Sequence, residues 1–266
     1  MSAVEVSRGD GPVVLGLPHT GTFVPDDIRH RLNENGRGLA DTDWHVHELY
    51  EGLLDGVTTV RTPVHRYVID CNRDPSRASL YPGMNTTALV PDTDFDGKPI
   101  WKPGAEPTEA DIAHRLNDHF WPYHVALEAE LARVRERHGV VILYDCHSIR
   151  GDIPFLFAGR LTDLNIGTDS GKTCAELVEK IVIRHCKSSD YSCVLNGRFK
   201  GGWTTRHYGR PAEDWHAIQM EIAQAAYMDE TPPWTWRPEK AERLRTLLRA
   251  ILSDLADLAP TLKGAA

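Results

Sequence analysis

The segment GVVILYDCHSIRG, residues Gly139 to Gly151, joins the pattern of a buried strand to a run of reactive side chains. Its first part, Val140–Leu143, is wholly apolar, which is typical of a strand buried on both faces. An acid, a thiol, an imidazole and a hydroxyl follow in Asp145–Ser148. A hydrophobic core has no need of these four side chains, so we infer that the strand carries them into a functional site.

Strand-like and helix-like segments alternate along the rest of the chain. Buried strands are expected at residues 13–17, on both sides of Pro63 with the second at 67–69, at 153–159 and at 191–195. Helices are expected at 41–54 with a cap at Asp41 or Thr42, at 108–138 with a bend at Pro122, at 170–186 and at 239–258. Residues 201–211 are expected to form a glycine-rich loop, and 216–224 fit a strand or a helix. This alternation predicts an α/β fold with a mixed, mostly parallel sheet flanked by helices.

We expect one layered domain over residues 1–266, because the sequence shows no repeat, linker or low-complexity tail. Residues 82–107 are rich in Gly, Pro, Asp and Thr and are expected to form a long surface loop. Whether this loop closes over a substrate stays open.

The composition excludes several classes of protein. With 38 acidic and 30 basic residues the formal net charge is −8, which gives no electrostatic reason to bind nucleic acid. No apolar run approaches the roughly 20 residues of a membrane-spanning helix, and the segment MSAVEVSRGDGP does not resemble a secretory signal. Five cysteines without C-x-x-C spacing indicate reduced thiols. We therefore expect a cytoplasmic protein without nucleic-acid or membrane partners, and the oligomeric state stays open.

Three expected strands end in polar side chains that could meet. In an open α/β sheet, ligands bind beyond the carboxyl ends of the parallel strands. His19 follows the first strand, Asp70–Arg73 follows the strand after Pro63, and Asp145 and His147 end the strand quoted above. If these ends are neighbours, imidazoles, carboxylates and a guanidinium gather in one cleft.

Two histidines and one carboxylate, with a position left for water, form a ligand set of catalytic zinc. His19 and His147 are the candidate histidines, and the candidate acids are Asp43, Asp41 and Asp145. Zinc lowers the pKa of its water towards about 7 and polarises a carbonyl group. On a continuing strand Asp145 and His147 point to the same side, so Asp145 is alternatively the acid that orients His147.

Each candidate also has a plainer explanation. A histidine at a strand-to-turn junction is more often a hydrogen-bonded turn residue than a metal ligand, and Arg73 alone would be a surface ion-pair partner. Asp43 alone would be an acid that answers a helix dipole. Cys146 is expected to be a small buried side chain, because a nucleophilic pair with His147 would need strand neighbours to face the same way. The functional interpretation depends on all of them sharing one end of the sheet.

Glu221 lies inside an apolar stretch, between Met220 and Ile222. An isolated buried carboxylate is costly, so this acid is either paired with an arginine or catalytic. In the second interpretation Glu221 is a general base whose pKa is raised by its apolar surroundings.

Five segments are longer and more specific than any single motif: PHTGTFVP, DTDWHVHELY, RYVIDCNRDP, LYDCHSIRG and NGRFKGGWTTRHYGRPAEDWHAIQMEIAQAAYM. Together they resemble the N-formylglutamate amidohydrolase family, over roughly Val13 to Met228. The resemblance implies a fold similar to zinc carboxypeptidases and to the aspartoacylase and succinylglutamate desuccinylase group. The order along the chain there is a ligand histidine, a ligand acid, an Asn-Arg pair, a second ligand histidine and a catalytic glutamate. This chain offers His19, Asp43, Asn72–Arg73, His147 and Glu221 in that order.

The resemblance implies hydrolysis of N-formyl-L-glutamate to formate and L-glutamate, in histidine degradation. His19, Asp43 and His147 would hold one zinc ion, although another divalent metal is not excluded. Carboxypeptidases take their first histidine and acid from an H-x-x-E turn, whereas His19 is followed by Thr20, Gly21 and Thr22. The acid must then come from farther along, and Asp43 is preferred to Asp41.

Further roles follow from the same resemblance. Glu221 would take a proton from water and pass it to the leaving nitrogen. Arg66 would stabilise the oxyanion. Asn72 and Arg73 would bind the α-carboxylate of the substrate, since a guanidinium suits a carboxylate, and Arg206 would bind its side-chain carboxylate.

Two other functions stay open from the sequence. One is a related metallo-amidohydrolase or carboxypeptidase-like enzyme that acts on another N-acyl amino acid, such as acetylaspartate or succinylglutamate. The other is a non-catalytic protein that binds a metal or an amino acid, and Glu221 argues against it because a binding protein needs no such base.

Overall fold

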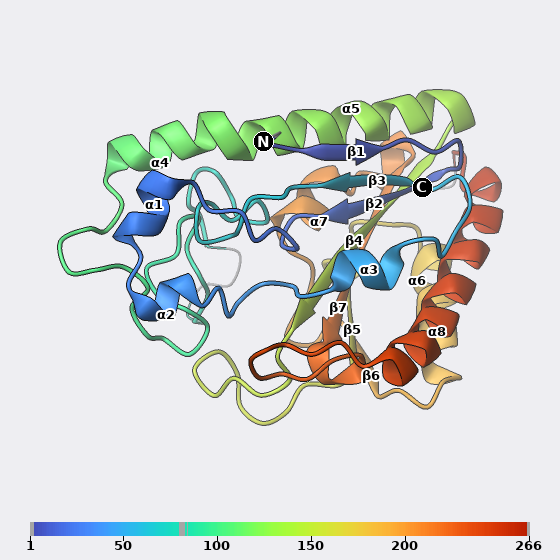
Figure 1. Cartoon of the computed structure of the whole chain (residues 1–266). Helices are drawn as coiled ribbons and strands as arrows, with labels where there is room; N and C mark the ends of the chain where they lie inside the picture. The colour runs from blue at the N-terminus through green and yellow to red at the C-terminus, as the bar shows by residue number, and fades with distance from the viewer. Residues whose placement is uncertain (1–2, 80–82, 84, 265–266) are drawn as a thin grey trace.

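One seven-stranded sheet runs through the protein, in the order β1-β3-β2-β4-β7-β5-β6 (Figure 1). The structure is a computed structural model that describes residues 3–79, 83 and 85–264. The strands are β1 (Glu5–Ser7), β2 (Val13–Leu17), β3 (Thr58–Arg61), β4 (Val141–Ile149), β5 (Leu164–Gly167), β6 (Cys193–Leu195) and β7 (Trp215–Ala223). The central strands β3, β2, β4 and β7 are parallel, whereas β1 is antiparallel to β3 and β5 is antiparallel to β7. The predicted mixed, mostly parallel sheet is confirmed.

Helices cover both faces of this sheet. They are α1 (Asp26–Arg31), α2 (Glu34–Arg37), α3 (Val46–Tyr50), α4 (Glu109–Arg115), α5 (Trp121–His138), α6 (Glu176–Lys187), α7 (Trp203–Tyr208) and α8 (Pro238–Leu258). Val141 and Leu143 of β4 pack into the apolar cluster of α5, while Ile142 and Tyr144 pack into that of α6 and α8. The strand is therefore buried on both faces, as its apolar run predicts. Within the described residues no helix combines the length and the apolar character needed to cross a membrane.

The expected long helix is interrupted near Pro122. Thr108 and Asp111 form a reciprocal capping box at the start of α4, as the sequence suggests. A π-helical stretch, Leu116–Phe120, then leads into α5, whose first turn holds Pro122. Proline has no N–H to donate. Pro122 lies in the first turn of α5, where the backbone N–H groups have no acceptor within that helix. The helix ends at Gly139, which has a φ of 78°.

Two segments predicted as strands have other structures. Tyr67 and Val68 lie within a turn, in which the backbone N–H of Val68 donates to the carbonyl of His65 and that of Tyr67 donates to the ring of the same histidine. Residues 153–159 also form turns, and the strand of this region is β5, which lies farther along. Residues 67–69 are apolar because they are buried, whereas in 153–159 only Ile153 is buried and Phe155 is exposed. Short apolar runs therefore do not specify a strand.

Three further predictions were wrong in extent or type. The helix expected at 41–54 is only α3, because His45 adopts a left-handed φ of 61° at its start. The expected glycine-rich loop at 201–211 contains α7, which begins directly after Gly202. The helix expected at 170–186 begins only at Glu176. In contrast, the ambiguous segment 216–224 is almost entirely strand, in β7.

The loop predicted at 82–107 has neither a helix nor a strand in its described part; residues 82 and 84 lie outside the described residues. Much of it is not surface, because Leu89, Phe95, Ile100 and Trp101 are buried. A bridge between Leu32 and Trp101 ties it to the segment after α1.

Candidate active site

Four polar side chains lie side by side on the neighbouring strands β4 and β7. In the parallel register Asp145 is opposite Gln219, and His147 is opposite Glu221. These residues continue the alternation that directs Leu143 and Ala217 towards α5. Cys146 packs into the opposite cluster, and burial raises the pKa of its thiol well above the usual value. It is therefore the buried side chain expected from the sequence.

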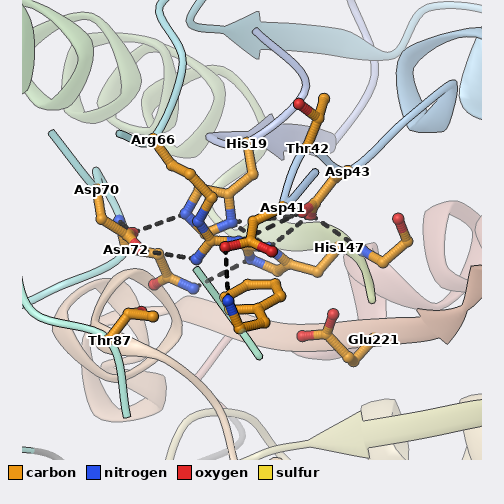
Figure 2. Close-up of polar contacts among 12 residues, drawn as sticks. His19, Asp41, Thr42, Asp43, Arg66, Asp70, Asn72, Thr87, His147 and Glu221 are labelled. Carbon is orange, nitrogen blue, oxygen red and sulfur yellow. Dashed lines mark hydrogen bonds and ion pairs between the residues drawn. The ribbon is translucent and has the colours of Figure 1, made fainter. Parts of the chain in front are cut away.

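His19, Asp43 and His147 converge on one point (Figure 2). The Nδ1 atoms of His19 and His147 are 3.2 Å apart. Oδ2 of Asp43 lies 3.7 Å from Nδ1 of His19 and 3.4 Å from Nδ1 of His147. All three residues are buried, and a ligand atom from each lies within 4.8 Å of the others. The group could therefore hold a metal ion.

The second nitrogen of each histidine faces another carboxylate. Nε2 of His19 is 2.7 Å from Oδ1 of Asp70, and Nε2 of His147 is 3.0 Å from Oδ1 of Asp145. A carboxylate at Nε2 keeps the proton there and leaves the lone pair of Nδ1 for a ligand bond. Two such lone pairs facing a carboxylate oxygen repel one another unless a cation lies between them. The donor set therefore fits a divalent metal.

The structure distinguishes the three candidate acids. Asp43 belongs to the converging group, and the backbone N–H of Ser148 holds its Oδ2 at 3.0 Å. Asp41 instead accepts hydrogen bonds from the hydroxyl of Tyr67 at 2.8 Å and from the backbone of Phe95 at 2.9 Å, both on Oδ2. Asp145 lies at the other ring nitrogen of His147, Nε2, and does not belong to the converging group. The geometry favours Asp43 as the acid of the metal group.

The electrostatics of the group favour a positive charge. Burial opposes ionisation of Asp43, yet His147 and His19 hold the pKa of its carboxyl below the usual range. Burial likewise lowers the pKa of His147, but Asp145 and Asp43 raise it well above the ordinary value. A metal cation can replace these protons, because metal binding releases them from its ligands.

Glu221 is a buried acid beside this group (Figure 2). Burial raises its pKa to about 7, with Asp43 adding to the shift, while His147 and Arg66 oppose it. Nε2 of Gln219 donates to Oε2 of Glu221 at 3.0 Å. An acid with a pKa near neutrality can both take and return a proton, which is what a general base requires.

The two histidines of the metal group and Glu221 line one cavity of about 270 Å³. Its wall includes His19, His147 and Glu221, together with Asn72, Gln219 and the arginines Arg66, Arg73, Arg77 and Arg198. The basic cluster that an anionic ligand needs in this acidic protein is therefore present. Apolar side chains, among them Phe95, Leu156 and Phe199, and the segment Asn85–Leu89 complete the wall.

Two predicted site residues, Asp43 and Arg206, do not line the cavity; Asp43 still belongs to the metal group, whereas Arg206 is held elsewhere. Its Nε donates to the carbonyl of Gly201 at 2.9 Å, and its Nη2 lies 3.5 Å from Oδ1 of Asp169. The other predicted residues meet as expected: Arg66 donates to Asp70 at 2.6 Å, and Nδ2 of Asn72 lies 3.2 Å from Nε2 of His147.

Sequence reasoning assigned no role to Asp70, Gln219 or Arg198. Asp70 precedes the Asn72–Arg73 pair, and Gln219 stands two residues before Glu221, on the same side of β7. These spacings are the only sequence signals for the first two. Arg198 lies in a loop and carries no such signal.

Comparisons with known proteins identify related enzymes. The family model of N-formylglutamate amidohydrolase matches residues 11–228. The chain is 41% identical over 254 residues to N-formylglutamate deformylase of Pseudomonas aeruginosa, covering 95% of each chain. It is 42% identical over 250 residues to N-formylglutamate deformylase of Pseudomonas putida, covering 93% of each.

The fold is shared with a solved structure, N-formylglutamate amidohydrolase from Ralstonia eutropha. The TM-score is 0.82 at 24% sequence identity, covering 97% of this chain and 99% of that chain. The family model and the identity to both deformylases show that this chain is an amidohydrolase enzyme and belongs to the N-formylglutamate amidohydrolase family.

Proposed function

We propose that this enzyme hydrolyses N-formyl-L-glutamate to formate and L-glutamate, with one zinc ion held by His19, Asp43 and His147. One observation carries the proposal: the three converging donors lie beside a buried glutamate and four arginines that line a single cavity. The proposed substrate is taken from the names of both Pseudomonas relatives. Imidazole and carboxylate ligands suit zinc, and other divalent metals remain competitors.

Zinc bound at this group would supply a Lewis acid that polarises a carbonyl and acidifies water. Glu221 would act as the general base, which takes a proton from the attacking water and delivers it to the leaving nitrogen. Its raised pKa suits both halves of this task. Asp70 and Asp145 would orient the ligand histidines through their Nε2 atoms.

The arginines would bind and polarise the substrate. Arg73 and Asn72 would hold the α-carboxylate, with the guanidinium of Arg73 oriented by Thr87. Arg66 would stabilise the oxyanion. It is buried against Asp70, and among the described residues its Nε has no hydrogen-bond acceptor.

We infer, as the family resemblance implies, that the chain acts as one domain, in histidine degradation and in the cytoplasm. The five free cysteines are consistent with a reducing compartment.

The experiment that tests the function measures formate release from N-formyl-L-glutamate. We expect activity that a chelator abolishes and added zinc restores. Activity that survives complete metal removal would contradict the zinc mechanism even if the substrate is correct. Rates on formyl-, acetyl- and succinyl-glutamate distinguish the formyl substrate from its competitors.

A Glu221→Gln variant separates catalysis from binding. It keeps the size of the side chain but removes the base, so we expect turnover to fall by about 10²- to 10⁴-fold with zinc content unchanged. Glu239→Gln, on the exposed side of α8, is the matched control. Unchanged turnover in Glu221→Gln would remove this residue from the mechanism.

A further inference from the structure

The first turn of α7 donates three hydrogen bonds to residues of the candidate site. The donors are the backbone N–H groups of Gly202 and Thr204 and the hydroxyl of Thr205, which reach Oε1 of Gln219, Oδ1 of Asn72 and Oδ2 of Asp145 at 2.6, 2.9 and 2.8 Å respectively. The first two bonds come from the backbone, so a change of side chain does not remove them. The third depends on a side chain, so the role of Thr205 can be tested by mutation.

This turn of α7 lies close against the site. A Cβ atom on Gly202 would stand 2.3 to 2.6 Å from the amide group of Asn72, which is closer than such atoms can pack. The backbone of Gly202 has a φ of −78° and suits any residue. The glycine is therefore needed for the close approach of Asn72 and not for its own conformation. The turn can shift little without displacing the side chains that it contacts.

The hydroxyl of Thr205 fixes the carboxylate that faces His147. Oδ2 of Asp145 accepts from this hydroxyl at 2.8 Å, while Oδ1 lies 3.0 Å from Nε2 of His147. Besides that ring, Thr205 is the only hydrogen-bond donor to the carboxylate within the described residues. The bond to Oδ2 limits rotation of the carboxylate and keeps Oδ1 opposite the ring nitrogen. A histidine ligand depends on such a carboxylate for its orientation and its basicity.

Thr205 belongs neither to the metal group nor to the cavity wall. Its side chain is fully buried, and the described residues that line the cavity do not include it. A hydroxyl that donates to a carboxylate makes a charge-assisted hydrogen bond, which is stronger than a neutral one. Its loss would leave Oδ2 of Asp145 buried without a donor. We then expect the carboxylate to turn away from His147.

We propose that Thr205 is a positioning residue of the metal group, which acts on His147 through Asp145. The hydroxyl raises the affinity of the group for a divalent cation without touching the cation or the substrate. The inference rests on the proposed function for the presence of a metal, but it concerns metal affinity and can be tested without substrate.

The test removes the hydroxyl from the full-length protein and keeps the shape of the side chain, in Thr205→Val. Competition with a chelator should show a zinc affinity about three- to tenfold lower than in the wild type, which is a part of the cost of losing a direct histidine partner. Thr205→Ser keeps the hydroxyl and should bind zinc as tightly as the wild type. Unchanged affinity in Thr205→Val, or an equal loss in Thr205→Ser, would overturn the proposal.

A matched control removes a different buried hydroxyl. Thr173 donates to the carbonyl of Ala217 at 2.8 Å, the same distance as in the bond from Thr205 to Asp145. Thr173→Val should therefore leave the zinc affinity unchanged. A loss equal to that of Thr205→Val would overturn the proposal, because any buried threonine would then have the same effect. Thr205→Ala also lacks the hydroxyl and replaces the valine variant if that variant does not fold.

A double variant measures the coupling between Thr205 and Asp145. Asp145→Ala alone should weaken zinc binding about 10- to 100-fold, as for the loss of a direct partner of a ligand histidine. Adding Thr205→Val to Asp145→Ala should cause no further loss, because the acceptor of the hydroxyl is already gone. Two losses that simply multiply would contradict a route through Asp145.

The same preparations distinguish this proposal from the proposed reaction. Weaker zinc binding in Thr205→Val, with no formate release from N-formyl-L-glutamate by any zinc-loaded preparation, would uphold Thr205 and reject the reaction. Formate release by the wild type, with equal zinc affinity in the wild type and Thr205→Val, would do the reverse. A wild-type protein that binds no zinc would overturn both.

Discussion

Gln219 and Glu221 form a hydrogen-bonded pair on the same side of β7, with Nε2 of the amide 3.0 Å from Oε2 of the acid. The backbone N–H of Gly202 donates to the other end of the amide, Oε1 of Gln219, at 2.6 Å. Because Oε1 already accepts a hydrogen bond, the amide can only present its N–H groups to Glu221. The pair therefore fixes the orientation of the carboxylate and favours its ionised form.

We predict that Gln219→Leu lowers kcat about tenfold, because one hydrogen bond to a charged group is lost and the carboxylate is free to turn. KM and zinc content should be nearly unchanged, since neither the metal group nor Arg73 is touched. Steady-state kinetics and metal analysis on the same preparation check this. A loss of zinc in Gln219→Leu would show that the residue supports the metal group rather than the base.

The raised pKa of Glu221 predicts an acidic limb in the pH–rate profile. The base must be ionised to act, so kcat/KM should rise with pH as Glu221 loses its proton. Its pKa is about 7 in the absence of a metal, and a bound cation lowers it. The limb should therefore lie at or below about pH 7. A limb above pH 8 would assign the titration to another group.

Much of the fold is predictable from the sequence because its central strands are long apolar runs. The stretch at 140–143 specifies β4, and 13–17 coincides with β2. The short apolar segments at 67–69 and 153–159 were wrongly predicted as strands, because their backbone forms turns; the first is buried, whereas most of the second is exposed or half-buried. Likewise, no local pattern announces the left-handed φ of His45 that shortens α3.

The candidate site was predictable where strand ends carry unusual side chains, as at His19 and His147. The positions of the arginine side chains were harder to predict, because they depend on the paths of the loops that carry them. Arg206 and Arg198 both follow β6, and nothing in the sequence says which of them enters the cavity. Asp70 supports His19 from a segment 51 residues away along the chain, a relationship that only the fold creates.

Asp70 is predicted to control zinc affinity without binding the ion. Asp70→Asn keeps an acceptor for Nε2 of His19 but removes the negative charge that strengthens this ligand and pairs with Arg66. Loss of such a partner costs about 10- to 100-fold in metal affinity. Titration with a competing chelator measures the change, and Asp55→Asn, an exposed acid, is the control. Equal zinc affinity in both variants would contradict this role.

Ionisation of the buried carboxyl of Asp41 is predicted to lower the free energy of unfolding as the pH rises. Burial raises the pKa of its carboxyl from 3.8 to about 7, although Tyr67 opposes the shift. The folded state therefore holds a proton that the unfolded state has lost, so the free energy of unfolding should fall between about pH 4 and pH 7. Three pKa units set an upper limit of about 4 kcal/mol for this effect.

The variant Asp41→Asn removes this titration while keeping an oxygen for the hydroxyl of Tyr67 and the N–H of Phe95. Urea unfolding of the metal-free protein at pH 5 and pH 8 should show a smaller loss of stability in Asp41→Asn than in the wild type. Because Asp41 stands outside the group of His19, Asp43 and His147, the variant should still bind one zinc ion. A variant with the wild-type pH dependence would show that Asp41 is ionised in the folded protein. Loss of zinc from the variant would indicate that Asp41 is a metal ligand.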